Sequence, residues 1–262
     1  MSVYSIIFSP TGGTKKVADL FANAFAEEYK EIDLTDASKD FSEYAFGNED
    51  ICIVSVPSFG GRVPAKAAEQ MGNLSGNKAK TILIAVYGNR EYEDTLVEMQ
   101  DVMQAAGFVP VAAVAALAEH SIVRTFAAGR PDKNDAKVLA EFAQKVRAKL
   151  EESCAADISG NEQSGEFIIP GDRPYKQVGV FPSKPKLTEA CVKCGICVKA
   201  CPVQAIPEDL STSMDEEKCI SCMRCEAVCP AKARRVAQPV IDFLNEKLSA
   251  GAKGYKENQL FL

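Results

Sequence analysis

The stretch Cys191-Val-Lys-Cys194-Gly-Ile-Cys197-Val-Lys-Ala-Cys201-Pro202 decides the fold of the last third of the chain. It returns 28 positions later (191 and 219) as Cys219-Ile-Ser-Cys222-Met-Arg-Cys225-Glu-Ala-Val-Cys229-Pro230. The two copies hold eight of the ten cysteines. Two-residue gaps let one short loop present three thiolates to one inorganic core, and thiolates are the soft ligands that iron–sulfur clusters require. The repeated stretch therefore predicts two iron–sulfur sites.

Structural zinc and a disulfide framework are the two alternatives. A zinc ribbon uses two C-x2-C knuckles and four ligands, and needs neither a third cysteine per knuckle nor a cysteine before proline. The chain shows no secretory leader at its start, where Met1-Ser-Val-Tyr precedes a short apolar run. Without such a leader, closely spaced cysteines indicate metal rather than disulfides.

The 191–230 segment resembles bacterial-type ferredoxins that carry two 4Fe–4S clusters. In such ferredoxins the cysteine before each proline ligates the opposite cluster. The resemblance implies one ligand set for cluster I, which we call the cluster I set, and another for cluster II, the cluster II set. The cluster I set is Cys191, Cys194, Cys197 and Cys229, and the cluster II set is Cys219, Cys222, Cys225 and Cys201.

Residues 1–152 alternate apolar strands with amphipathic helices. Continuous apolar strands of this kind predict a parallel sheet covered on both faces, and five of them fit the doubly wound order 2-1-3-4-5. The expected strands are Val3–Ser9, Glu31–Leu34, Ile51–Val56, Thr81–Val86 and Val109–Leu117. The expected helices follow Thr14 and then cover about Ala65–Gly72, Glu91–Ala106 and Asp132–Glu151.

The loop after the first strand has the composition of an anion site. Ser9, Thr11 and Thr14 supply hydroxyls, while Gly12 and Gly13 let the backbone approach a ligand at the start of a helix. The loop lacks the lysine of a nucleoside-triphosphate loop. The alternative is an ordinary helix start, with Thr11 or Thr14 as the cap.

This loop resembles the phosphate-binding loop of flavodoxins, and its place after the first strand of a doubly wound sheet strengthens the resemblance. The resemblance implies FMN, with its ring held by the next two loops. The residues implied for the ring are Pro57, Ser58, Phe59, Gly60, Gly61, Arg62, Tyr87, Gly88, Asn89 and Tyr92. The alternative makes Phe59, Tyr87 and Tyr92 core aromatics and Arg62 a solvated charge.

His120 is the single histidine and follows the fifth expected strand. A lone loop histidine is usually solvated. Its position at the ligand edge of the sheet allows a second interpretation, as a catalytic proton donor near flavin or substrate.

The predicted organisation has four parts. Residues 1–152 form a flavodoxin-like FMN domain, 153–185 a proline-rich linker packed on it, 186–237 a smaller α+β ferredoxin domain, and 238–262 a helix and tail. The helix, over Pro239–Ser249, is expected to dock on one of the domains. The tail is expected to be mobile, although Leu260-Phe-Leu262 has the apolar character to dock.

The formal charge is −6, and two thiolate-bound clusters would add negative charge. This balance excludes nucleic acid as a partner and predicts docking to basic faces of redox proteins. The longest apolar run, Val109–Ala118, is too short to span a membrane. A cytoplasmic location and a possible homodimer are the remaining expectations.

As a whole the chain resembles flavodoxin–ferredoxin fusion proteins of anaerobic bacteria. The resemblance covers residues 1–150 and 186–235 and implies electron transfer between two 4Fe–4S clusters, FMN and a redox partner. One alternative is an FMN-dependent reductase of a small-molecule acceptor, fed by its own clusters. A redox sensor is a third possibility, although no basic DNA-binding helix supports it. No G-x-G-x-x-G fingerprint for a nicotinamide cofactor occurs.

Overall fold

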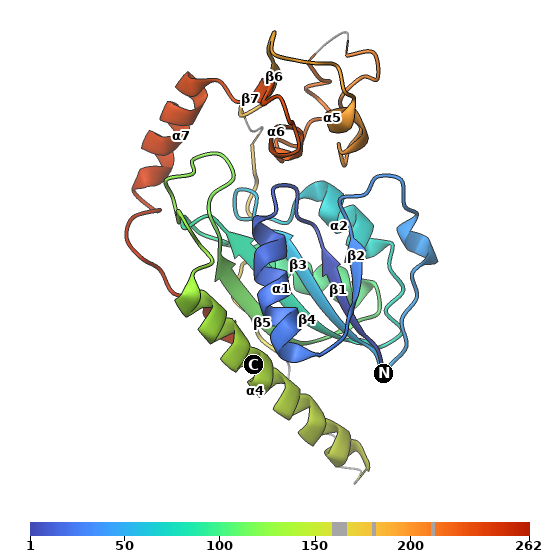
Figure 1. Cartoon of the computed structure of the whole chain (residues 1–262). Helices are drawn as coiled ribbons and strands as arrows, with labels where there is room; N and C mark the ends of the chain where they lie inside the picture. The colour runs from blue at the N-terminus through green and yellow to red at the C-terminus, as the bar shows by residue number, and fades with distance from the viewer. Residues whose placement is uncertain (159–166, 180–181, 211–212) are drawn as a thin grey trace.

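The computed structural model describes residues 1–158, 167–179, 182–210 and 213–262. A sheet with helices on both faces forms the larger part, and a small region built around the cysteines lies at one end of that sheet (Figure 1). Among the described residues, no helix has both the length and the apolar character needed to cross a membrane.

The central sheet has the doubly wound order predicted from the sequence. Its parallel strands are β1 (Val3–Ile7), β2 (Lys30–Asp33), β3 (Ile51–Pro57), β4 (Lys80–Tyr87) and β5 (Val109–Leu117). They lie side by side as β2-β1-β3-β4-β5, which is the flavodoxin-like order. The order reverses between β1 and β3, and the loops after these strands therefore meet at the edge where such sheets bind ligands.

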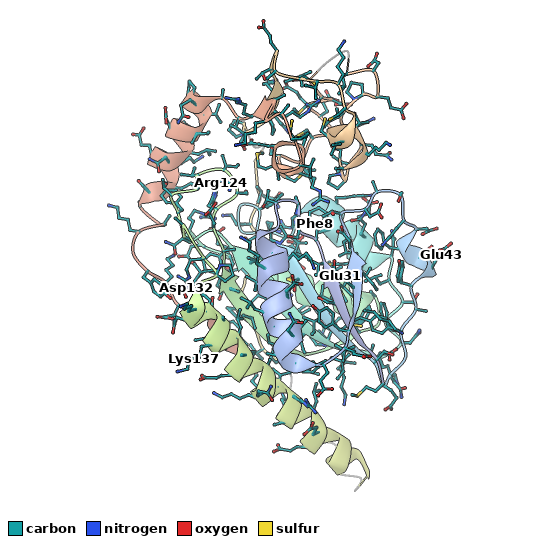
Figure 2. The ribbon with its side chains drawn as sticks, viewed as in Figure 1. Phe8, Glu31, Glu43, Arg124, Asp132 and Lys137 are labelled. Carbon is teal, nitrogen blue, oxygen red and sulfur yellow. The ribbon has the colours of Figure 1, made fainter. Side chains whose placement is uncertain are left out.

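Each face of the sheet carries its own apolar core. Helices α1 (Gly13–Phe25) and α4 (Lys133–Ile158) pack together over one face, and α2 (Ala65–Gly72) and α3 (Thr95–Ala105) over the other. A short 3-10 turn, η1 (Phe41–Glu43), lies beyond β2. Figure 2 shows Phe8 inside these layers, where it is fully buried, whereas Glu43 and Lys137 are exposed on the outside. Burial on both faces explains why the strands are continuous apolar runs.

The tail does not lie free: its apolar end docks on the sheet, which is the alternative that its sequence allowed. Residues Gln259–Phe261 form β8, a sixth strand that pairs antiparallel with β5 at Ala113–Ala115. The sheet therefore has six strands instead of the expected five. The side chain of Asn258 accepts a hydrogen bond from the Leu117 backbone at 3.0 Å. This strand covers the edge of β5, which would otherwise present unpaired backbone groups.

Residues 167–179 of the 153–185 segment lie along α3. Ile169 is buried in the core beneath α3, and the Asp94 carboxylate accepts hydrogen bonds from the backbones of Asp172 (2.9 Å) and Lys176 (2.7 Å). Arg173 forms an ion pair with Asp101 at 2.6 Å. Helix α4 itself continues to Ile158, six residues past the expected end of the first domain. Residues 159–166 and 180–181 of the expected linker lie outside the described residues.

The small region repeats its own backbone conformation. A two-stranded ribbon of β6 (Lys186–Leu187) and β7 (Arg234–Arg235) accompanies the short helices α5 (Ile196–Lys199) and α6 (Arg224–Ala227). Positive φ angles recur at the 28-residue offset, at 55° and 54° for Lys193 and Ser221 and at 50° and 49° for Gln204 and Lys232. The sequence repeat is therefore also a structural repeat.

Helix α7 (Gln238–Ser249) connects this region to the tail. It begins with Pro239 in its first turn, where the missing N–H of proline is not needed. None of its residues is buried, and Phe243 remains 53% exposed. The helix lies beside the sheet, not within a core (Figure 1).

Candidate functional site

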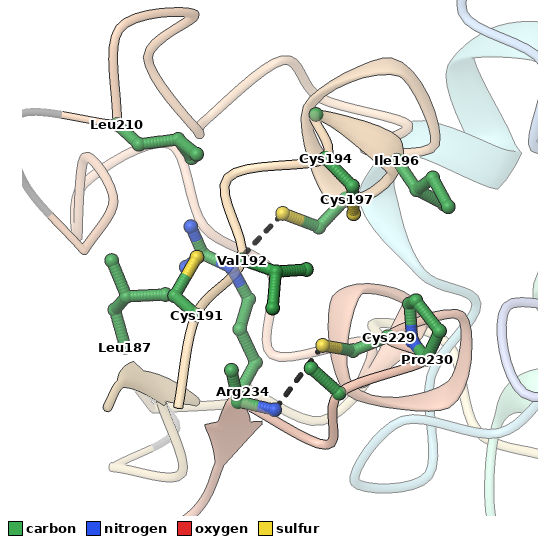
Figure 3. A pocket seen from close by; sticks show the side chains of 13 residues that line it. Leu187, Cys191, Val192, Cys194, Ile196, Cys197, Leu210, Cys229, Pro230 and Arg234 are labelled. Carbon is green, nitrogen blue, oxygen red and sulfur yellow. Dashed lines mark hydrogen bonds between the residues drawn. The ribbon is translucent and has the colours of Figure 1, made fainter. Parts of the chain in front are cut away.

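The cluster I set lines one small cavity. Cys191, Cys194, Cys197 and Cys229 surround it together with Val192, Ile196 and Arg234 (Figure 3). Cys191 and Cys194 come from the loop that leads into α5, Cys197 comes from α5 itself, and Cys229 follows α6. The structure thus brings together the four cysteines that the resemblance to two-cluster ferredoxins assigns to cluster I.

The cluster II set lines a second cavity of the same kind. Cys201, Cys219, Cys222 and Cys225 surround it, with Ile206 and Met223 among the apolar neighbours. Burial raises the pKa of the Cys222 and Cys225 thiols to about 12. A coordinated metal would remove those protons, because a metal-bound thiol is deprotonated outright.

Backbone donors point at the sulfur atoms in both halves. The amide of Ala205 donates to Cys201 Sγ at 3.3 Å, and the amide of Ala233 donates to Cys229 Sγ at 3.2 Å. The amide of Lys193 donates to Cys191 Sγ at 3.4 Å. Hydrogen bonds to sulfur help to set the reduction potential of an iron–sulfur cluster. Four cysteines per cavity and these donors fit a 4Fe–4S cluster in each half.

Arg234 is the unexpected member of the cluster I cavity. Its side chain is 1% exposed, and its Nε donates to Cys197 Sγ at 3.2 Å (Figure 3). One guanidinium nitrogen donates to the Ser213 carbonyl, and the other, Nη2, is buried without a hydrogen-bond partner among the described residues. A buried unpaired donor beside four cysteine sulfurs suits an anionic metal–sulfur core.

A much larger cavity, of about 670 Å³, lies at the carboxyl ends of the sheet strands. Its volume falls within the range of sites that bind cofactors and small molecules. The residues implied by the flavodoxin resemblance that line it are Thr11, Gly13, Thr14, Pro57, Ser58, Phe59, Gly60, Tyr87 and Gly88. Three consecutive strand-end loops therefore converge on one space.

The anion end of this cavity is the start of α1. Gly12, the residue before the helix, adopts a φ of +89° and has no side chain to cap it, and no acidic residue lies in the first turn. The hydroxyl of Ser9 accepts a hydrogen bond from the Lys15 backbone in that turn at 2.9 Å. Thr11 and Thr14 line the cavity at this helix end, which favours a negatively charged group.

Three residues implied for the flavin ring serve other contacts. Arg62 forms a two-pronged ion pair with Glu98 at 2.7 and 2.8 Å and stacks on Tyr175. Asn89 is buried and donates to the carbonyls of residues 252 and 254. Tyr92 is buried and donates to the Gln259 side chain at 2.6 Å. None of the three lines the cavity, so the geometry of this structure gives their assignment to the ring no support.

Ser9, Gly12 and Gly61 also do not line the cavity, although they shape its loops. Gly61 has a φ of +89°, and a Cβ at this position would meet Glu93. Its role is to let two loops approach each other rather than to contact a ligand.

His120 lies at the cavity wall and is not a solvated loop residue. A Cβ on Gly88 would meet its ring at 2.6 Å, so the glycine makes room for the imidazole. Its Nδ1 accepts hydrogen bonds from the backbones of Ile122 and Val123 at 3.2 and 3.0 Å. Burial, together with the positive charge of Arg90, lowers the pKa of His120 to about 4. The ring is therefore neutral at pH 7, with its proton on Nε2.

Several residues of the cavity were missed by sequence reasoning. Ser183 and Ser221 line it, and their buried hydroxyls have no hydrogen-bond partner among the described residues. Helix α7 contributes Phe243, Leu244, Lys247 and Leu248 to the wall. The helical spacing of these α7 residues predicted an apolar helix face, but it did not indicate that this face would line the large cavity. Buried hydroxyls without a partner in a cavity of this size indicate a ligand that carries polar groups.

The large cavity reaches the cluster II set. Cys222 and its neighbour Ile220 line both the cluster II cavity and the large cavity, and Ser221 between them lines the large cavity. Arg224 fastens this contact, because its guanidinium lies 3.3 Å from the Pro10 carbonyl and 3.5 Å from that of Ser9. The cluster I set has no residue at the large cavity.

Comparison with known proteins gives one family match. Residues 190–233 match the family model described as a 4Fe-4S dicluster domain. No curated protein matches the chain.

Solved structures similar to the chain include two flavodoxins and an azoreductase. A Streptococcus pneumonia TIGR4 flavodoxin is 21% identical with a TM-score of 0.40, and covers 56% of this chain and 99% of its own. The two-electron reduced Megasphaera elsdenii flavodoxin is 16% identical with a TM-score of 0.39, at 55% and 98% coverage. An azoreductase from Bacillus anthracis is 13% identical with a TM-score of 0.37, at 57% and 100% coverage.

These identities and TM-scores are low, and the assignment of the first domain rests on its strand order. The assignment of the second part rests on the family match and on the two four-cysteine cavities. The chain therefore joins a domain of flavodoxin-like fold to a 4Fe-4S dicluster domain of the ferredoxin type.

Proposed function

We propose that the protein is an electron-transfer flavoprotein in which the two cysteine sets each hold a 4Fe–4S cluster and the large cavity holds FMN. Bound in these sites, the clusters supply single-electron chemistry and FMN supplies one- or two-electron chemistry. The observation that carries the proposal is that Cys222 belongs to the walls of two cavities at once.

The chain's own residues divide the work of the flavin site. The start of α1, with Thr11 and Thr14, would hold the phosphate. The loops at Pro57–Gly60 and Tyr87–Gly88 would hold the ring from two sides. Lys176–Gly179 and α7 form a further wall of the cavity.

The arrangement of the two sets predicts an order of electron transfer. The cluster II set adjoins the large cavity. The cluster I set has no residue at that cavity, and its Cys194 is exposed. Electrons exchanged with an external protein would therefore use the cluster I set, and those exchanged with the flavin site would use the cluster II set.

A second candidate function is reduction of a small molecule in the large cavity. The specific observation in its favour is His120, whose Nδ1 is engaged by two backbone amides, so that the neutral ring keeps its Nε2–H to donate a hydrogen bond to a bound acceptor. Turnover with a small acceptor in the absence of any partner protein would distinguish this function from electron transfer.

The test is anaerobic purification followed by quantification of iron, sulfide and flavin. We expect about eight irons per chain and one FMN, and a reductive titration in which EPR shows two interacting reduced clusters. The matched variants are Cys194→Ser and Cys222→Ser, which occupy equivalent positions of the repeat. Both should lose one cluster, but only Cys222→Ser should also disturb the absorbance of the flavin. Zinc in place of iron, or clusters without flavin, would contradict the proposal.

A further inference from the structure

The two copies of the cysteine motif present equivalent faces, and only one of them is covered. We call residues 220–224 the inner face and residues 192–196, which are their counterparts 28 positions earlier, the outer face. On the inner face Ser221 is 6%, Cys222 9% and Met223 2% exposed. On the outer face Val192 is 68% and Ile196 44% exposed, and Lys193 and Cys194 are exposed as well.

The inner face is covered by the chain's own flavodoxin-like domain. Ile220 packs against the apolar core of that domain, and Arg224 reaches the carbonyls of its first loop. The equivalent residues of the outer face, Val192 and Ile196, have no such neighbour and lie at the rim of the cluster I cavity (Figure 3). The repeat thus gives the small domain two equivalent faces, and the flavodoxin-like domain of the same chain covers only the inner one.

The exposed side chains that flank the outer face are mainly basic. Segments 190–200 and 229–237, which form most of the wall of the cluster I cavity, contain Lys193, Lys199, Lys232, Arg234 and Arg235 and no acidic residue. The three lysines are exposed. The acidic residues of the small domain stand mainly at 208–217, a stretch that reaches the cavity wall only at Leu210, and Glu189 precedes the first segment.

We propose that the outer face is the docking site of an acidic one-electron carrier protein. The inference rests on the proposed function and names its partner. One electron leaves the reduced carrier and enters the iron–sulfur group held by the cluster I set. The carrier is thereby oxidised and the group reduced by one electron, while no bond forms and no proton moves.

The net charge of −6 predicts a basic partner, but the local charges decide the encounter. Exposed charges farther apart than about 10 Å are largely screened at 0.1 M salt. A partner at the outer face therefore senses the lysine cluster more than the acidic residues of the flavodoxin-like domain. The exposed Val192 and Ile196 supply the apolar centre that such an interface needs inside its charged rim.

The test uses the anaerobic holoprotein with two probes, an acidic plant-type 2Fe–2S ferredoxin and a basic cytochrome c. Binding is followed by calorimetry, and the rate of electron exchange with the acidic probe by stopped-flow absorbance. The variant is Lys193→Glu with Lys199→Glu. The matched control is Lys218→Glu, an exposed lysine of the same domain beside Asp215.

We expect the double variant to slow electron exchange with the acidic ferredoxin about 10-fold or more at low salt, because it reverses the steering charges. At raised salt the rates of electron exchange of the double variant and of the unchanged protein should become similar. The Lys218→Glu control should bind and react as the unchanged protein does. Equal rates for the double variant, or tighter binding of the basic cytochrome at this face, would overturn the inference. So would a dimer in sedimentation velocity that the lysine substitutions abolish, since the occupant would then be a second copy.

These outcomes separate the inference from the proposed function. Loss of carrier binding with intact exchange between clusters and flavin would leave the function standing and remove only the docking site. Carrier binding at the outer face without any electron reaching the flavin would support the docking site and contradict the proposed function.

Discussion

Arg234 and Ile206 occupy equivalent positions in the two halves of the small domain, 28 residues apart. Ile206 lines the cluster II cavity, and Arg234 places a buried guanidinium in the cluster I cavity. The backbone is repeated around both, as the matched amide–sulfur contacts of Ala205 and Ala233 show. The charge of one side chain is therefore a main difference between two otherwise similar four-cysteine cavities.

Replacing Arg234 by isoleucine should lower the reduction potential of cluster I. A buried positive charge stabilises the more negative, reduced state, and its removal should shift the potential by an amount on the order of tens of millivolts. EPR-monitored redox titration measures the two potentials separately. Arg234→Lys should recover part of the shift, and Ile206→Val should leave cluster I unaffected. An unchanged cluster I potential in Arg234→Ile would show that the guanidinium has only a packing role.

His120 gives a prediction about pH. Its pKa of about 4 in the folded protein lies below the 6.5 of an exposed histidine, because burial and Arg90 disfavour the charged ring. Its neutral form thus contributes stability that is complete above about pH 6.5 and is lost as the pH falls toward 4. The nitrogen NMR shifts of this single histidine in ¹⁵N-histidine-labelled, oxidised protein should stay constant from pH 8 to pH 5.5. A midpoint near 6.5 would show that the ring is solvated.

At the scale of elements, α3 and the 167–179 segment form one unit. Asp94, just before the first turn of α3, accepts hydrogen bonds from the backbone amides of Asp172 and Lys176. Asp101, further along the same helix, forms an ion pair with Arg173 at the surface. Burial opposes the charge of Asp94, but these hydrogen bonds and the nearby cations outweigh it, so the pKa of this carboxyl is lowered. The segment is thereby fixed where Lys176–Gly179 meets the large cavity.

Replacing Asp94 by alanine should release this segment. Two charge-assisted hydrogen bonds are lost, and the free energy of unfolding should fall by about 2–4 kcal/mol. Thermal denaturation of the holoprotein measures the stability, and limited proteolysis between residues 167 and 179 measures the release. Asp101→Ala removes a more exposed ion pair with Arg173 and one hydrogen bond from the Tyr175 hydroxyl, and should cost less than Asp94→Ala. Equal stability and equal proteolysis of the two variants would show that Asp94 is not what fixes the 167–179 segment to α3.

The elements and the cysteine motif were predictable from the sequence, because each leaves a local pattern. Continuous apolar runs predicted β1 to β5, and the order of the sheet followed from their alternation with helices. The side-chain directions of Arg62, Asn89 and Tyr92 were not predictable. Their partners, Glu98 and residues 252 to 259, lie 36 to 167 positions away, and no local pattern reports such contacts. The same distance hid β8, whose pairing with β5 joins residues 113 and 261.

At the scale of the whole molecule, the small domain is attached to the larger one at both of its ends. The 167–176 segment is bound along α3 before it, and residues 252–261 are bound to the sheet after it. Arg224 adds a third attachment at the first loop. Two tethers of this kind keep the inner face at the large cavity without any encounter step, so exchange between cluster II and flavin should not depend on protein concentration.

The placement of β8 also bears on how the chain acquires its structure during synthesis. Residues 1–158 leave the ribosome first and contain the five parallel strands with their four helices. The strand that covers the edge of β5 is made about one hundred residues later, after both cysteine motifs have emerged. Until then the β5 edge is open to pairing with other chains. The edge is therefore closed only after the ribosome has delivered every cysteine of the two four-cysteine cavities.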